Sequence, residues 1–200
     1  MPSDRQFSDE LEEWLQGDRV KTLGVLGEAF GEKSFAVTIL LLMFVPALPL
    51  PTGGITHVFE VITVIVAMQM VLGRRTIWLP RRFEQRELGA TITGKAVPFI
   101  IRRVRWFEKF SRPRFAGLFG QRWFARILGL VIIGFTAGAA LAPPFSGLDT
   151  LPALGVVTIS LAIILEDVVV LGAGALIGVG GIALIVTIGA ALASFLRGLF

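Results

Sequence analysis

The stretch "PALPLPTGGITHVFEVITVIVAMQM" (residues 46–70) decides the fold, because it joins an irregular segment to an apolar run of membrane-spanning length. Three prolines and two glycines precede the run 55–73. As α-helix, this run rises about 28 Å, close to the ~30 Å hydrocarbon core of a bilayer. The same helix carries His57, Glu60 and Gln69, which a lipid-facing surface disfavours. The stretch therefore predicts a membrane helix that follows a proline- and glycine-rich break in a helical hairpin. The polar side chains on this helix need an explanation.

The composition extends this prediction to the whole chain. Hydrophobic residues make up 54% of the sequence and the mean hydropathy is +0.76. We therefore expect an all-α integral membrane protein. The absence of cysteine excludes disulfides, thiolate catalysis and cysteine-ligated metals, and a single histidine argues against a multi-histidine metal site. We expect neither a metal nor another cofactor.

Apolar runs predict about five transmembrane or re-entrant helices, with four or six remaining open. The first run is short and is expected to break at Pro46, since eleven residues of helix rise only about 16 Å. The last is too long for one untilted crossing, and its glycines predict either a break or very close helix packing. That glycine-rich segment is also compatible with a homodimer. The runs are residues 35–45, 55–73, 127–141, 151–165 and 168–196.

Basic residues set the expected topology. Of 19 Lys and Arg residues, 14 lie between Arg74 and Arg126, which places this segment on the cytoplasmic side. Two crossings precede it, so we expect a cytoplasmic N-terminus in a multi-pass protein. Clustering beside membrane spans indicates contact with the bilayer and its anionic lipids rather than nucleic acid. The chain then divides into an N-terminal amphipathic segment (1–33), a first membrane hairpin (34–73), a basic segment (74–126), and a second hairpin with a glycine-rich membrane segment (127–200).

Two further segments have the pattern of amphipathic interfacial helices. "FSDELEEWLQ" (residues 7–16) has an acidic first turn, and Ser8 is expected to be its N-cap. In "PFIIRRVRWFEKF" (residues 98–110), apolar side chains share one face and the basic ones lie largely off it. This is typical of a helix that lies in an anionic interface. The predicted lipid-binding residues are Arg102, Arg103 and Arg105.

A shift of 97 positions indicates an internal repeat. It aligns Pro46 with Pro143 and Gln69 with Glu166, and gives each half two apolar helices around a break. Counting crossings makes the copies parallel. Repeats with discontinuous helices point to a transporter-type site between the copies. The alternative is that two proline-containing hairpins align by chance, and that both breaks are ordinary turns at the membrane surface.

Four polar residues are the predicted substrate- or proton-binding site: His57, Glu60, Gln69 and Glu166. His57 and Glu60 are three residues apart and share a helix face. An ionised Glu60 within lipid favours pairing, protonation or an aqueous cavity, whereas a shallow position would let it reach water. The alternative for Gln69 is that a polar residue is tolerated there because it lies close to the membrane–water interface. Glu166 is either an internal group matching Gln69 or part of a loop between two spans.

Several segments together resemble the exopolysaccharide synthesis ExoD family. They are "FAVTILLLMFVPALPLP", "QMVLGRRTIWLPRR", "ILGLVIIGFTAGAALAPPF" and "LPALGVVTISLAIILED", and residues 69–80 are the most specific of them. The resemblance implies a bacterial inner-membrane protein linked to exopolysaccharide production, and it names no catalytic residue. We do not expect an enzyme, since no nucleophile–base arrangement is evident. The leading hypothesis is an ion-coupled transporter with a polar site between two broken hairpins. The alternative is a non-catalytic accessory protein for polysaccharide assembly.

Overall fold

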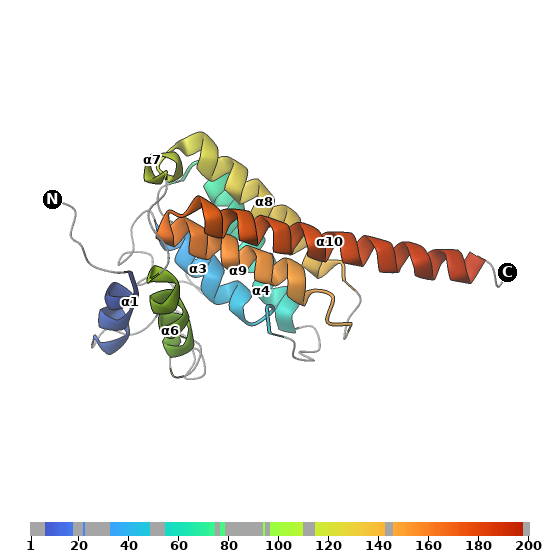
Figure 1. Cartoon of the computed structure of the whole chain (residues 1–200), viewed down its shortest axis with the longest axis horizontal. Helices are drawn as coiled ribbons and strands as arrows, with labels where there is room; N and C mark the ends of the chain where they lie inside the picture. Colours follow the sequence, from blue (N-terminus) through green and yellow to red (C-terminus); the bar gives the residue numbers. More distant parts are fainter. Residues whose placement is uncertain are drawn as a thin grey trace.

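The computed structural model of the chain describes residues 7–17, 22, 33–48, 55–74, 77–78, 94, 97–109, 115–142 and 146–197. Regular structure in these residues is helical, which confirms the all-α prediction (Figure 1). The apolar runs become helices that begin and end within a few residues of the predicted bounds. The helices are α1 (Phe7–Gln16), α3 (Ser34–Phe44), α4 (Ile55–Val71), α6 (Val97–Glu108), α7 (Ala116–Phe119), α8 (Arg122–Ala140), α9 (Thr150–Leu165) and α10 (Val168–Arg197).

Two helical hairpins form the centre of the molecule. Helices α3 and α4 make the first hairpin, α8 and α9 make the second, and each helix of one hairpin packs against a helix of the other. The C-terminal ends of α3 and α8 lie at the same end of the bundle (Figure 1). The hairpins therefore run in the same direction, as parallel copies would. The bends themselves, residues 49–54 and 143–145, lie outside the described residues.

Apolar side chains from all four helices fill the space between the hairpins. These chains are almost wholly removed from the surface, and their burial is the main favourable contribution to folding of this region. Branched and long residues interdigitate there without a buried lysine or arginine among the described residues. The buried members of this core are Phe35, Ile39, Met43, Val66, Ala67, Met70, Leu128, Ile132, Phe135, Ala153, Val156 and Ile159.

Helix α10 runs unbroken for 30 residues along α9 and continues past the end of the bundle (Figure 1). Glycines allow the two helices to touch by their backbones. A Cβ atom added to Gly155 of α9 would lie 2.6 Å from the Cα of Gly178, and one added to Gly181 would lie 2.6 Å from Cδ of Pro152. The close packing predicted for the glycine-rich segment is confirmed, and the alternative of a break is wrong.

Two of the described helices are long and apolar enough to cross a membrane, namely Arg122–Ala140 and Val168–Ala191. Three other apolar helices are shorter: Ser34–Phe44, Thr56–Val71 and Thr150–Leu165. The first stops where the proline-rich bend begins, and 16 residues of helix rise only about 24 Å. The helix lengths therefore do not confirm the predicted count of about five transmembrane or re-entrant helices.

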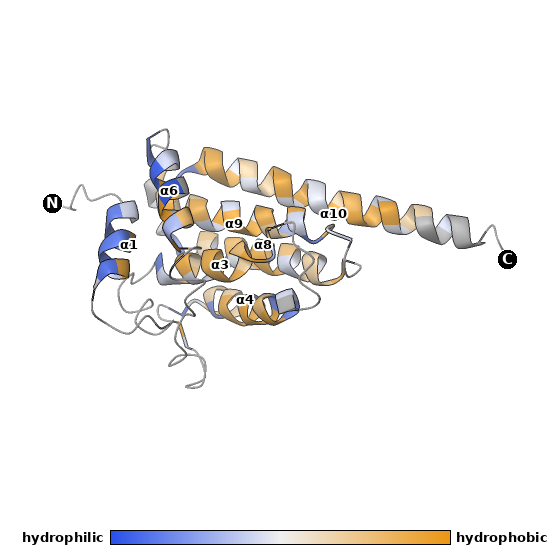
Figure 2. Cartoon of the chain, turned by 90° about the horizontal axis from the view of Figure 1, so that it is seen from below, coloured by the Kyte–Doolittle hydropathy of each residue, from blue (hydrophilic) through white to orange (hydrophobic). Residues whose placement is uncertain are grey.

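Helices α1 and α6 pack on each other and on the outer side of α3 and α9. Their apolar stripes meet residues of the bundle in a second core (Leu11, Ala36, Val37, Leu40, Leu41, Val97, Ile101, Val104, Leu161 and Ile164). Figure 2 shows the hydrophilic residues of α1 standing apart from the hydrophobic bundle. The apolar faces predicted for both helices therefore pack against other helices of the same chain. Residues 18–21 and 23–32, which follow α1, lie outside the described residues.

The predicted N-cap of α1 is wrong. Ser8 lies inside the helix, which begins at Phe7, and the Ser8 side chain is buried. Its backbone N–H and its hydroxyl donate to the two carboxylate oxygens of Glu108, at 3.0 and 2.5 Å. The first turn of α1 is therefore satisfied by an acid from α6, a long-range partner that a local pattern does not reveal.

Candidate functional site

The buried carboxylate of Glu60 is the most unusual group in the bundle. Nδ1 of His57 lies 2.7 Å from its Oε2 atom. The two side chains differ sharply in exposure, 46% for His57 and 2% for Glu60. The helical spacing that predicted a shared face thus produces a direct contact, in which the surface imidazole covers the buried acid.

The second oxygen of Glu60 has no hydrogen-bond partner among the described residues. Several buried hydroxyl groups also lack a hydrogen-bond partner among the described residues, including those of Thr63 on α4 and Thr136 on α8. Buried polar atoms are normally paired, because an unpaired one costs about 1–3 kcal/mol. One oxygen of this buried carboxylate is therefore left unpaired by the described residues.

Helix register gives the relative heights of these groups in the bundle. A Cβ atom added to Gly129 would lie 3.1 Å from the carbonyl oxygen of Ala67, so these residues of α8 and α4 are neighbours. The two helices run in opposite directions. Seven residues along each, about 10 Å of rise, place Thr136 at the level of Glu60, and Thr63 is one turn of α4 away.

Gln69 has a structural partner. Its side-chain amide donates to the Trp78 carbonyl oxygen at 2.8 Å, and the Trp78 backbone N–H donates to its Oε1 at 2.7 Å. Gly73, with φ of 75°, ends α4 and lets the Arg74 N–H reach the Gln69 carbonyl at 3.0 Å. The side chain of Gln69 therefore fastens the segment after α4, and this explains part of the motif in residues 69–80. Residues 79–80 lie outside the described part.

Glu166 lies in the turn between α9 and α10, as the loop alternative predicts. It adopts a left-handed conformation, with φ of 53°, and its carboxylate lies 3.1 Å from Nζ of Lys33. Asp167 then accepts a hydrogen bond from the Val169 N–H, which caps α10. Glu60 lies near the opposite end, since residues 60–71 of α4 rise about 16 Å. The structure thus brings His57 and Glu60 together, but neither Gln69 nor Glu166 joins them.

The predicted lipid-binding residues have different environments. Arg105 binds acids of α1, with Nη2 at 2.5 Å from Glu12 Oε2 and 3.2 Å from Asp9 Oδ1. The hydrogen bond to Glu12 raises the pKa of Arg105 further above an ordinary value that already keeps it charged. Arg102 is exposed, whereas the Arg103 side chain lies outside the described part of the chain. Arg105 is therefore engaged in joining α1 to α6.

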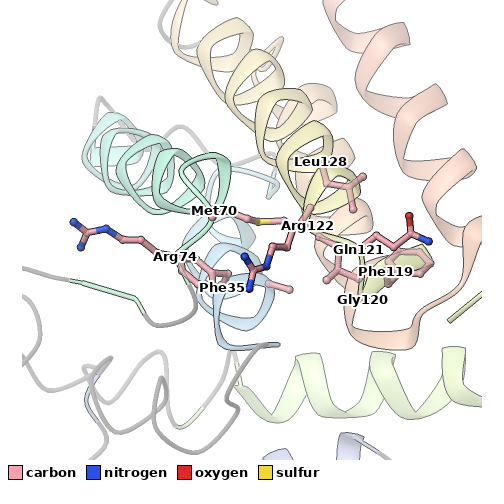
Figure 3. Close-up of a pocket in the computed structure, with 12 residues that line it drawn as sticks. Phe35, Met70, Arg74, Phe119, Gly120, Gln121, Arg122 and Leu128 are labelled. Atoms are coloured by element: carbon pink, nitrogen blue, oxygen red, sulfur yellow. The ribbon is translucent and has the colours of Figure 1, made fainter. Parts of the chain in front are cut away.

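A pocket that the sequence did not predict opens at one end of the bundle (Figure 3). We call this the basic end, defined by Lys33, Arg74, Arg122 and Arg126. The pocket has a volume of about 190 Å³. Arg122 begins α8, five residues before the predicted third run (127–141), and only the fold brings it near Phe35 and Arg74. The lining residues are Phe35, Ala36, Met70, Gly73, Arg74, Phe119, Gly120, Gln121, Arg122, Ala125, Leu128 and Ile163.

Comparison with known proteins identifies relatives along most of the chain. A family model described as "Exopolysaccharide synthesis, ExoD" matches residues 7–187. Protein slr1875 of Synechocystis is 28% identical over 184 residues, which cover 87% of this chain and 82% of that protein. Protein ExoD of Rhizobium meliloti is 28% identical over 180 residues, covering 86% of this chain and 72% of that protein. No solved structure matches the chain.

Proposed function

The chain belongs to the exopolysaccharide synthesis ExoD family, and from this membership we propose that it is a bacterial inner-membrane protein that binds and releases a proton at Glu60 during exopolysaccharide production. The observation that carries the proposal is a buried carboxylate with one oxygen against an exposed histidine and the other unpaired. Proton binding would drive an ion-coupled transport step. The proposal assigns no catalytic reaction to the chain.

The surface of the bundle supports a location in the membrane. Large apolar side chains are exposed along α4 at a spacing of three and four residues, so they form one continuous stripe (Val58, Val61, Ile65, Met68 and Leu72). Exposed apolar residues also follow α8 and α10, and the helices carrying them are hydrophobic over most of their length (Figure 2). Water-facing surfaces rarely carry apolar patches of this extent, whereas lipid favours them.

The pair offers a route for a proton between the surface and the interior. A proton taken up by His57 gives an imidazolium, and transfer from Nδ1 to Glu60 Oε2 across 2.7 Å gives neutral imidazole and a neutral carboxylic acid. Neutralising the acid removes the cost of keeping a buried charge. The new O–H is then a donor that the ionised form lacked, so the packing of α4 responds to the protonation state.

The decisive experiment measures polysaccharide output and proton binding for the same variants. Glu60→Gln removes the titratable group and keeps the size of the side chain. We expect polysaccharide output to be lost while the variant still accumulates in the membrane fraction. Purified wild-type protein in proteoliposomes should take up protons after an acid pulse, detected with a trapped pH-sensitive dye, and Glu60→Gln should not.

The matched control is Glu166→Gln, which removes a carboxylate from the turn between α9 and α10 and should retain both activities. Full output and proton uptake in Glu60→Gln would overturn the proton role. The non-catalytic accessory function would then be the better account of the family's association with exopolysaccharide. Recovery of the wild-type chain in the soluble fraction would overturn the membrane location itself.

A further inference from the structure

We infer that the pocket at the basic end binds the phosphate headgroup of an anionic lipid. The inference uses the membrane location of the proposed function and is independent of proton binding at Glu60. The ligand chemistry that the pocket fits is a phosphate group beside a short apolar group. The structure favours a lipid as its source, rather than a free phosphate ion.

The pocket combines an apolar floor with a cationic mouth. Phe35, Met70 and Leu128 come from three different helices and lie at its base. In Figure 3, Arg122 reaches across the opening toward Phe35, whereas Arg74 extends outward from the rim. A guanidinium group presents paired N–H donors that match two phosphate oxygens. Arg122 is therefore the expected direct ligand, and Arg74 adds charge from the rim.

The arginine charge at this end is not neutralised by acids among the described residues. Glu166 is already engaged by Lys33, and Asp167 accepts the hydrogen bond that caps α10. No ion pair joins Arg74, Arg122 or Arg126 to an acid in the described part of the chain. The local excess of arginine therefore attracts an anion from outside the protein.

Size and surroundings favour a lipid over a soluble metabolite. At about 190 Å³ the pocket is smaller than the roughly 300–1,000 Å³ sites of drug-sized ligands, and it suits a headgroup with a short piece of chain. An exposed apolar stripe on α8 begins beside Arg122 with Trp123 and continues to Ile127 and Leu130. The acyl chains of a bound lipid could therefore lie along this apolar stripe, which starts at the opening of the pocket. Trp123, whose Nε1 donates to Gln121, occupies the position typical of a headgroup-level aromatic residue.

Native mass spectrometry of the detergent-solubilised full chain tests the assignment. The probes are phosphatidic acid, phosphatidylglycerol and phosphatidylcholine with identical acyl chains. We expect the two anionic lipids to be retained in preference to phosphatidylcholine. Arg122→Gln should lower the affinity for phosphatidic acid about tenfold or more, the size of one charge-assisted hydrogen bond, and Arg74→Gln should lower it less.

The matched control is Lys109→Gln, which removes one positive charge from an exposed position just after α6 and should leave retention unchanged. Equal losses in Lys109→Gln and Arg122→Gln would overturn the assignment, because net charge alone would then explain binding. Competition by glycerol 3-phosphate at the same concentration as the lipid would overturn the choice of a lipid. Lipid selectivity measured in Glu60→Gln separates this site from the proton site, since that variant should bind lipid normally.

Discussion

The outer faces of α4 and α9 occupy matching places in the two hairpins and have opposite surroundings. On α9, Gly155 lies against the backbone of Gly178, and α10 covers this side of the helix. The residue 97 positions earlier is Val58 of α4, which is 57% exposed. Further bulky apolar residues continue the same uncovered face of α4.

The difference shows that the size of the side chains on a helix face determines how closely another helix can pack on it. Glycine lets another helix approach to backbone contact, and such approach is a main source of helix association in lipid. Valine and isoleucine hold a neighbour at a distance and present a surface that acyl chains can cover. On the side where the second hairpin receives α10, the first hairpin therefore exposes an apolar face.

The largest expected effect is at the α9 seam. Gly155→Leu places side-chain atoms where Gly178 already lies, since even a Cβ atom would approach its Cα to 2.6 Å. We expect the protein to be destabilised by about 3 kcal/mol or more, because a helix backbone cannot yield as a flexible side chain does. The measurement is thermal unfolding of the purified protein in detergent.

Val58→Leu is the matched control on α4. It adds one methylene group to an exposed side chain and should change stability by less than ~0.5 kcal/mol. If the two variants unfold at the same temperature, the proposed contrast between a helix-receiving face and a lipid-facing one is wrong.

The next comparison concerns the residues that the 97-position shift aligns, Gln69 and Glu166. Gln69→Leu removes two hydrogen bonds to the Trp78 backbone from a buried side chain. We expect a loss of about 1–3 kcal/mol. Unfolding in detergent measures it, and limited proteolysis after residue 74 should report release of the segment that Gln69 fastens.

Glu166→Gln should have a smaller effect on stability. The Lys33–Glu166 ion pair is partly exposed, with side chains 41% and 31% accessible, and such pairs contribute roughly 0–1 kcal/mol. A Glu166 variant as unstable as Gln69→Leu would show that the aligned residues have equivalent roles, contrary to their different contacts.

Helix positions were predictable from the sequence because apolar runs and proline breaks act locally. Runs 55–73 and 151–165 became α4 and α9 almost unchanged. The pair of His57 and Glu60 was also predictable, since spacing of three on one helix brings side chains together. What these residues share is a short separation along the chain.

The remaining features depend on contacts between distant segments. Glu108 reaches Ser8 across 100 positions, and Arg105 reaches Glu12 across 93. Amphipathic periodicity showed that α6 has an apolar face, but lipid and protein can both cover such a face. Because the pattern does not distinguish them, it did not predict the ion pairs that Arg105 makes with α1.

The smallest expected effect on stability comes from removing a single buried hydroxyl group. Thr63 and Ser160 carry such groups at positions that the 97-residue shift aligns. Neither hydroxyl has a partner among the described residues. Thr63 lies one turn of α4 from Glu60, and a buried water needs two to four polar partners.

Removing either hydroxyl should reveal whether its surroundings are hydrated. In a dry core, losing an unpaired hydroxyl stabilises the fold, whereas losing one that binds an internal water destabilises it. We therefore expect Thr63→Val to destabilise by about 1 kcal/mol and Ser160→Ala, with no described carboxylate one turn away, to stabilise by up to ~1 kcal/mol. Unfolding in detergent measures both signs. Stabilisation by Thr63→Val would mean that Glu60 lies in a dry core, and a proton would then have only His57 as its way in.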